Sequence, residues 1–271
     1  VEEFVRRGDP MISSEFFHRT STVQERQNRI WAVGRIFGAA RKRLRTRLKT
    51  DPLPEDVDEA IRELLKRTSV LRRISEALED GLKDESADVR LTACRCIATW
   101  PSLEFVHELT QILKTDKPPI RREAAKALGR IGNTNRNANI EVFGVVFRDV
   151  VPGLLTALGR DGIDRSEEHA IIFALIEIDD AESTAAGLAS KNASTIRGAM
   201  LALQAMSYED LTSQKLVPFL NSDDAALRST VVDLLASRQD AGPKIAETLT
   251  RSLRTKTFRE DTALRIAERF A

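Results

Sequence analysis

A short motif recurs along this chain of 271 residues: an aliphatic residue is followed directly by arginine. Three positions after the arginine stands a small or β-branched residue, and an aliphatic residue follows four positions later. On an α-helix these offsets place the residues in one stripe. The clear copies are 87–98, 118–129 and 225–235, and the first interval, from Val89 to Ile120, is 31 residues. A period of this length predicts stacked helix pairs, because one pair cannot bury its own apolar face.

Weaker copies and partner helices fill the remaining intervals. The stripe recurs in degenerate form at 167–178 and 195–206, and a second amphipathic helix is expected between copies, at 103–113, 150–158, 211–220 and 245–253. Acidic, Asn or Ser clusters precede the motif helices, as in 84–86 and 221–224, and such residues cap helix N-termini. The helix expected at 259–270 would cap the stack.

The first third follows the period less closely. A helix is expected at 25–36 with a partner helix at 39–48, and Asp51-Pro52-Leu53-Pro54 then breaks the chain. A further pair with irregular register is expected at 55–66 and 70–82. In the third unit, the sequence Gly129-Arg130-Ile131-Gly132 predicts a helix end, followed by a polar loop at 133–139.

The aliphatic-Arg helix pairs resemble the HEAT repeat, clearly in three copies and over roughly residues 83–257. The resemblance implies an all-α fold, a right-handed α-solenoid of about six helix pairs. In HEAT-like repeats this arginine typically bonds acidic or carbonyl groups of the adjacent unit. We therefore assign Arg90, Arg121 and Arg228 a structural role and not a ligand contact.

One repeat domain, 1–271, is expected. Its parts would be irregular basic helix pairs at 1–82, clearer repeats at 83–257 and a capping helix at 258–271, and we interpret the chain as a fragment of a longer protein.

The N-terminal part has a second, narrower resemblance. Phe4-Val5-Arg6-Arg7-Gly8 and the segment 26–36 are similar to the HEAT section of large secreted bacterial proteins classed as membrane-bound dehydrogenases. That family has a β-propeller before the repeats and a c-type haem domain after them. The resemblance implies that any catalytic domain lies outside this chain, and it implies a periplasmic or membrane-associated location. Without it, a cytoplasmic location is expected.

No set of residues with a recognisable reaction chemistry stands out. The three histidines fall in different units, and none has a partner at metal-ligand spacing. Cys94 and Cys96 point about 200° apart on a helix, which suits buried small residues better than a disulfide or a metal pair. Paired acids such as Glu167-Glu168 are expected at solvated helix ends. We therefore predict no catalytic, cofactor-binding or metal residue, no cofactor and no enzymatic activity in this chain, and no run of residues is apolar enough to span a membrane.

One segment is strongly basic although the net charge of the chain is only +1. Seven cations and no acid stand between positions 35 and 49, namely Arg35, Arg41, Lys42, Arg43, Arg45, Arg47 and Lys49. A helix with this charge could bind an acidic protein, a nucleic acid or an anionic lipid surface, or it could be a solvated face that answers the acidic stretch 55–59. These alternatives stay open at this point.

The function expected from these observations is a non-enzymatic protein-interaction scaffold, whose specificity comes from surface side chains of successive second helices. Its partners would be another protein or other domains of the parent chain, with the basic segment 35–49 as the candidate contact patch. The alternative is a nucleic-acid-binding protein. A HEAT-like family of glycosylases that act on alkylated DNA keeps that alternative open, although no acid and aromatic set is assigned to it here.

Overall fold

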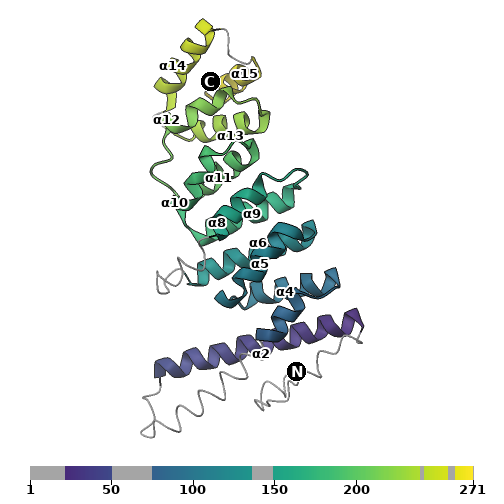
Figure 1. Ribbon diagram of the computed structural model, residues 1–271. Coiled ribbons are helices and arrows are strands. Elements are labelled where there is room, and N and C mark those ends of the chain that lie inside the picture. Colours follow the sequence, from purple (N-terminus) through teal and green to yellow (C-terminus); the bar gives the residue numbers. More distant parts are fainter. Residues whose placement is uncertain (1–21, 51–74, 136–148, 239–240, 256–259, 271) are drawn as a thin grey trace. The chain divides into compact units, whose positions relative to one another are not determined.

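The computed structural model describes residues 22–50, 75–135, 149–238, 241–255 and 260–270 (Figure 1). Every regular element in these ranges is helical. The elements are a helical segment at 75–82 and α2 (Val23–Thr50), α4 (Ala87–Thr99), η2 (Leu103–Phe105), α5 (Val106–Thr115), α6 (Pro118–Asn135), α8 (Val150–Leu158), α9 (Arg165–Ile178), α10 (Ala181–Ala185), η3 (Ala186–Ala189), α11 (Ala193–Ala205), α12 (Ser213–Leu216), η4 (Val217–Asn221), α13 (Ala225–Ala236), α14 (Ala241–Thr255) and α15 (Glu260–Phe270). The predicted all-α architecture of repeated helix pairs is confirmed.

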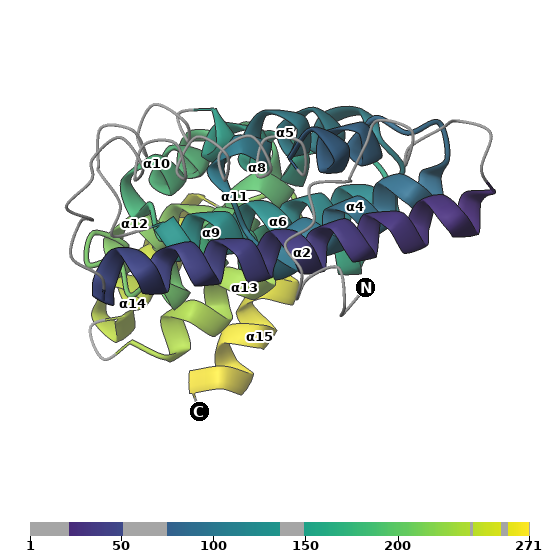
Figure 2. The ribbon, with the colours of Figure 1, turned by 90° about the horizontal axis from the view of Figure 1, so that it is seen from below.

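The chain divides into two compact units, residues 1–147 and 148–271. In the first unit α4 lies between α2 and α6, and α5 packs against α6 from a second layer (Figure 2). The interior between the layers is apolar: Ile97 of α4, Leu109 and Leu113 of α5 and Leu128 of α6 are fully buried. Burial of such side chains is the main contribution to the stability of the stack.

The second unit repeats the arrangement. The motif helix α11 contacts both α9 and α13, so the motif helices α9, α11 and α13 follow one another as direct neighbours. One cluster of buried residues includes Met200, Leu203, Leu211 and Leu235 and joins α11 and α13 to the segment between them. The stripe that the sequence motif predicts is therefore the surface by which the helix pairs pack.

Polar residues before the motif helices cap them as expected in this second unit. The carboxylates of Asp164 and Asp224 accept hydrogen bonds from the backbone N–H groups of Glu167 and Leu227, and the side chain of Asn192 caps α11 in the same way. At α4 the expectation is wrong, because the side chain at the capping position, Ser86, makes no capping hydrogen bond.

The prediction of two helices at 25–36 and 39–48 is wrong, because α2 is a single helix of 28 residues from Val23 to Thr50. No proline interrupts this segment, and its glycines are needed for packing and not for a turn. A Cβ at Gly34 would overlap the Sγ atom of Cys96, and one at Gly38 would overlap the indole of Trp100. Both positions allow α4 and its C-terminal end to approach α2 closely.

The predicted helix end at 129–132 is also wrong. Helix α6 continues to Asn135, so the first residues of the expected polar loop are helical. Gly129 and Gly132 are buried inside the helix, and the fully buried Ile131 between them anchors its last turns.

Two further segments differ from expectation. The amphipathic helix expected at 211–220 is split into α12 and the 3-10 helix η4, whose second residue is proline. The short elements α10 and η3 form a helix pair with α11 and were not predicted. They have only five and four residues, which is too short to show a helical pattern of apolar residues in the sequence.

Several expectations lie outside the described residues. These are the segment Phe4–Gly8, the helix at 55–66 and most of the polar loop at 133–139. The single repeat domain over 1–271 stays a prediction. In the described part of the chain, no helix is both long enough and apolar enough to cross a membrane.

Candidate binding face

The motif arginines hold the loops that precede their own helices. Arg90 and Arg228 are each the fourth residue of a motif helix, and the Nη1 atom of each donates to two backbone carbonyls five and six residues earlier. For Arg90 these are the carbonyls of Glu85 and Asp84, at 3.0 and 2.7 Å. For Arg228 they are the carbonyls of Asp223 and Ser222, at 3.1 and 2.8 Å. The same sequence position thus produces the same local structure in both units.

The other side of each guanidinium reaches the next helix pair. Arg90 donates from Nε and Nη2 to the two carboxylate oxygens of Asp116, at 2.6 and 2.9 Å. Asp116 lies two residues before the start of α6. Arg228 also reaches an acid of the next pair, because its Nη2 donates to one carboxylate oxygen of Asp261 in the first turn of α15. The prediction that this arginine bonds an acidic group of the adjacent unit is confirmed for both residues. The carbonyls that they bind belong instead to the loop before their own helix, and Arg121 likewise donates to the carbonyl of Asp116, five residues earlier.

The Arg90 contact changes the ionisation of its partner. Burial tends to raise the pKa of Asp116, but the hydrogen bonds from Arg90 and from the backbone N–H of Lys117 outweigh burial. The pKa of Asp116 therefore lies below its ordinary value, so the folded unit favours the charged carboxylate.

The second unit contains two ion pairs that were not predicted from the sequence. Arg197 of α11 pairs with Glu168 of α9, and the signal was present as the aliphatic-Arg pair Ile196-Arg197. Glu167 was expected at a solvated helix end, but it is fully buried and accepts a hydrogen bond from Arg160 at 3.0 Å. A buried carboxylate needs such a partner, because an unpaired charge there would be strongly destabilising.

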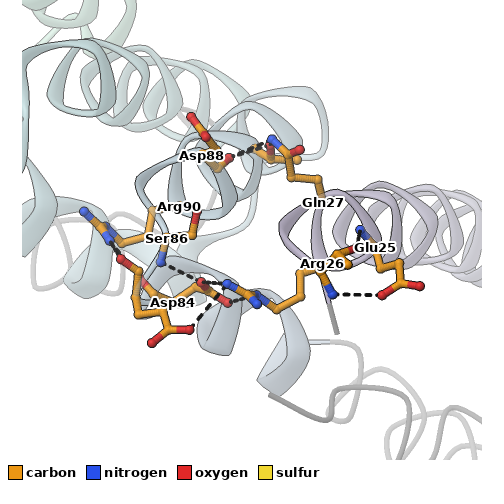
Figure 3. Close-up of polar contacts among 10 residues, drawn as sticks. Glu25, Arg26, Gln27, Asp84, Ser86, Asp88 and Arg90 are labelled. Atoms are coloured by element: carbon orange, nitrogen blue, oxygen red, sulfur yellow. Dashed lines mark hydrogen bonds and ion pairs between the residues drawn. The ribbon is translucent and has the colours of Figure 1, made fainter. Parts of the chain in front are cut away.

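A corresponding polar contact fixes α2 to the loop before α4 (Figure 3). The guanidinium of Arg26 meets the carboxylate of Asp84, with Nε–Oδ2 and Nη2–Oδ1 distances of 2.9 and 3.1 Å. Asp84 also accepts the backbone N–H of Ser86, and the amide of Gln27 donates to the carbonyl of Asp88. These groups are engaged within the fold, so they are poor candidates for ligand contacts.

A different set of side chains faces outward from the layer formed by α2, α4 and α6. The exposed or half-exposed members form a surface that we call the cationic face: Trp31 and Arg35 of α2, Arg95 of α4, and Arg122, Lys126 and Arg130 of α6. Within α2 and within α6 their spacing is four residues, as expected for side chains that share one side of a helix. Because α4 contacts both of its neighbours, the three outward stripes are adjacent.

A buried carboxylate lies beneath this face. Glu123 is 8% exposed, and its Oε1 atom is 3.2 Å from the Nζ atom of Lys126 and 3.8 Å from the Nε atom of Arg95. The side chains of Lys126 and Arg95 nevertheless keep 45% and 49% of their surface exposed. Glu123 thus orients two cations from neighbouring helices while leaving them accessible to a ligand.

An aromatic pair forms one end of the face. Trp31 is 39% exposed, and its ring meets the ring of Trp100 edge to face at a centroid distance of 6.1 Å. Trp100 in turn lies against Gly34 and Gly38 of α2. Large aromatic side chains that are partly exposed but fixed by a neighbour are common contact residues at interfaces.

The structure locates the predicted basic patch only in part. Arg35 is exposed on α2 beside Trp31. The other six predicted residues, Arg41, Lys42, Arg43, Arg45, Arg47 and Lys49, belong to the same helix, and their side chains lie outside the described residues. Four other cations of the face were not predicted, because they lie up to 95 positions from Arg35 and form no charge run: Arg95, Arg122, Lys126 and Arg130.

The described residues show no centre suited to a metal-dependent or thiol reaction. No three His, Cys, Asp or Glu side chains in these ranges gather in a way that could hold a metal ion. Cys94 and Cys96 are buried free thiols, as the sequence predicts. Burial raises the pKa of both, for Cys96 to about 12, so neither forms the thiolate at neutral pH.

Comparison with known proteins identifies part of this chain. Residues 75–142 match the family described as HEAT repeats. A comparison with characterised protein sequences finds no significant match. Similar solved structures include three engineered proteins from the Northeast Structural Genomics Consortium. The first aligns with a TM-score of 0.43 at 16% identity and covers 86% of this chain and 95% of its own. The others have TM-scores of 0.38 and 0.37 at 19% and 17% identity, covering 72% and 92% of this chain and 95% and 75% of theirs.

The matched residues include the helical segment at 75–82, α4, α5 and α6, together with the motif arginines Arg90 and Arg121. The family match thus falls on helices that pack in two layers in the first unit. The chain therefore contains HEAT repeats, which are identified over residues 75–142.

Proposed function

We propose that this chain is a non-enzymatic protein-interaction scaffold, with partners that bind the outward face of successive motif helices. The observation that carries the proposal is that the side chains which fix the repeats differ from those which face outward. Arg26, Arg90 and Arg228 are engaged in fixing the repeats, whereas Trp31 and Arg95 are directed to the surface of their layer. Stacked repeats present such faces to partners without rearranging their core.

The basic segment 35–49 lies on α2, the 28-residue helix that also carries Trp31. This shared helix supports including the segment in the contact surface. We propose that Arg35, Arg41, Lys42, Arg43, Arg45, Arg47 and Lys49 belong to the contact surface.

A selection of binding peptides from a displayed random library tests the proposal. The triple variant Arg41→Gln, Arg43→Gln, Arg45→Gln should weaken binding of the selected peptides about fivefold or more, because each exposed ion pair contributes roughly 0.2–1 kcal/mol. The matched control is Gln111→Ala with Lys114→Gln, on the exposed side of α5, which should change affinity less than twofold. The proposal would be overturned if the selected peptides bound the triple variant with unchanged affinity but bound the α5 control more weakly.

Nucleic acid is the second candidate ligand, favoured by the absence of any acid between positions 35 and 49. Seven phosphate contacts would give duplex binding whose log affinity falls with log salt at a slope of about −6. Fluorescence anisotropy with plain and alkylated duplexes at about 50 and 200 mM salt measures that slope. Steep, salt-sensitive binding that is lost in the triple variant would favour this candidate over the protein partner, and no binding at the lower salt would remove it.

The larger protein to which this module belongs is a separate proposal. The resemblance of 4–8 and 26–36 to bacterial dehydrogenases with propeller and haem domains predicts those domains in the parent gene. Reading the gene on both sides of this segment tests the proposal directly. Flanking sequence of another kind would remove the dehydrogenase and leave the scaffold proposal standing.

A further inference from the structure

We infer that the cationic face binds a short acidic peptide segment that carries an apolar side chain at one end. The inference rests on the proposed scaffold function and specifies the chemistry of the partner. Five of the six residues that define the face are cations and the sixth is Trp31, while Glu123, the acid beneath the face, is buried beside Lys126 and Arg95. The face therefore has a net positive charge and favours a negatively charged ligand.

The distribution of residues across the face gives the ligand a direction. Trp31 lies on α2 at one edge, Arg95 lies on the central helix α4, and Lys126 and Arg130 lie on α6 at the other edge. An apolar side chain can pack against the exposed part of Trp31, while carboxylates of the same segment reach the cations of α4 and α6. Within the described side chains of this face, Trp31 offers one apolar contact and no series of stacking platforms.

The size of the face limits the length of the segment. Packed helices are separated by about 8–10 Å, so three adjacent helices span roughly 20 Å from the first axis to the third. An extended chain advances about 3.3 Å per residue, so about six residues cross the face. The expected ligand thus has an apolar residue followed or preceded within about six positions by several Asp or Glu residues.

The arrangement favours a peptide over a nucleic acid. A single-stranded nucleic acid gains much of its affinity from stacking successive bases on several aromatic rings. Among the side chains that the structure describes on this face, Trp31 is the one exposed aromatic residue, and its partner Trp100 is engaged with Gly34 and Gly38. Arg95 and Lys126 are instead held about a buried carboxylate, which restricts their motion and reduces the entropy lost on pairing with a ligand.

The test uses two fluorescein-labelled octapeptides, each with one Phe and four Glu. The Phe is terminal in the first and central in the second, and the full chain is titrated with each by fluorescence anisotropy. We expect the peptide with terminal Phe to bind more tightly, and its version with Phe replaced by Ala to bind several-fold more weakly. The double variant Arg95→Gln, Arg130→Gln should weaken the first peptide about fivefold.

The matched control is the double variant Arg165→Gln, Lys191→Gln, which removes two exposed cations from the second unit. This control should leave affinity within twofold of the unchanged protein, and circular dichroism should show that both double variants fold. Trp31→Ala should abolish the preference for terminal Phe while retaining part of the affinity.

Three outcomes would overturn the inference. Equal binding of the acidic peptide by the unchanged protein and by the Arg95→Gln, Arg130→Gln variant would show that the face does not recognise it. Tighter binding of a single-stranded oligonucleotide of equal charge, with the same sensitivity to that variant, would assign the face to nucleic acid. Library-selected peptides that bind the motif helices but lack acidic residues would contradict this inference alone and leave the scaffold function intact.

Discussion

Arg90 and Asp116 form a two-point ion pair between consecutive helix pairs of the first unit. The side chain of Asp116 is only 8% exposed and that of Arg90 is 19% exposed, so water screens the pair little. Because the same guanidinium also donates to the carbonyls of Asp84 and Glu85, one side chain connects its own loop to the next repeat. The identity of this residue therefore affects the register of two neighbouring repeats.

Replacing Arg90 with Gln should lower the free energy of unfolding by about 2–4 kcal/mol, because it leaves the buried Asp116 carboxylate and two loop carbonyls without their donor. Arg90→Lys should have a smaller effect, since it keeps the charge but loses the two-point geometry. Guanidinium titration followed by circular dichroism measures both. The control Lys215→Gln removes a pair with Asp210 whose side chains are 53% and 72% exposed, and it should change stability by less than about 1 kcal/mol. An equal effect of Arg90→Gln and Lys215→Gln would contradict the role of Arg90.

The same pair predicts a loss of stability in acid. The pKa of Asp116 is lower in the folded chain than its ordinary value, so folding favours the carboxylate. The resulting stabilisation is complete above the ordinary aspartate pKa, near 3.8, and is lost as the pH falls through the lower pKa of the folded state. The unfolding free energies of the unchanged protein and of Asp116→Asn should therefore differ most at neutral pH and converge toward pH 2. The exposed-site variant Asp210→Asn should show no such convergence, and a gap for Asp116→Asn that widens in acid would refute the assignment.

Gly34 shows that a residue with poor helix propensity can be required inside a helix. Alanine favours a helix over glycine by about 1 kcal/mol, but a Cβ at position 34 would overlap Cys96 and come within 2.8 Å of Trp100. We therefore expect Gly34→Ala to destabilise the first unit by about 1–3 kcal/mol through overpacking. Gly242→Ala in α14 is the matched control, because a Cβ there meets nothing within 4 Å, and it should be neutral or slightly stabilising. Thermal unfolding of the two variants distinguishes these effects, and equal melting temperatures would show that α2 and α4 are less tightly packed.

The repeat architecture was predictable because its signal is periodic. The stripe around Val89, Ile120 and Leu227 located the motif helices, and the sequence also predicted that the arginines would serve the structure. Helix α2 was misread as two helices, because glycine resembles a break when its packing partner is unknown. Trp100 is 62 residues away from Gly38 in sequence, so no local pattern reveals that the two are in contact.

The candidate site was less predictable for a related reason. A run such as 41–49 is visible as a sequence feature, whereas Arg95, Lys126 and Arg130 are single charges among apolar residues. Only the side-by-side placement of α4 and α6 turns them into one surface. Glu167 illustrates the opposite case, since its sequence context suggested solvent although Arg160 and the fold enclose it.

The thiols of the two cysteines should not react with reagents in solution until the first unit unfolds. Cys94 and Cys96 are both fully buried, and burial raises the pKa of each thiol, so the reactive thiolate is scarce and inaccessible. Cys96 also donates a weak hydrogen bond to the carbonyl of Ile30 in α2. Reaction of these thiols with a chromogenic disulfide reagent at pH 8 should therefore be at least about a hundredfold slower in buffer than in guanidinium. In the denatured protein, two thiols per chain should react.

Gly34→Ala offers an independent check, because a helix α2 displaced from Cys96 should expose that thiol and speed its reaction without denaturant. The matched Gly242→Ala variant should react as slowly as the unchanged protein. Rapid reaction of either thiol in the unchanged protein would mean that α4 is not enclosed between α2 and α6.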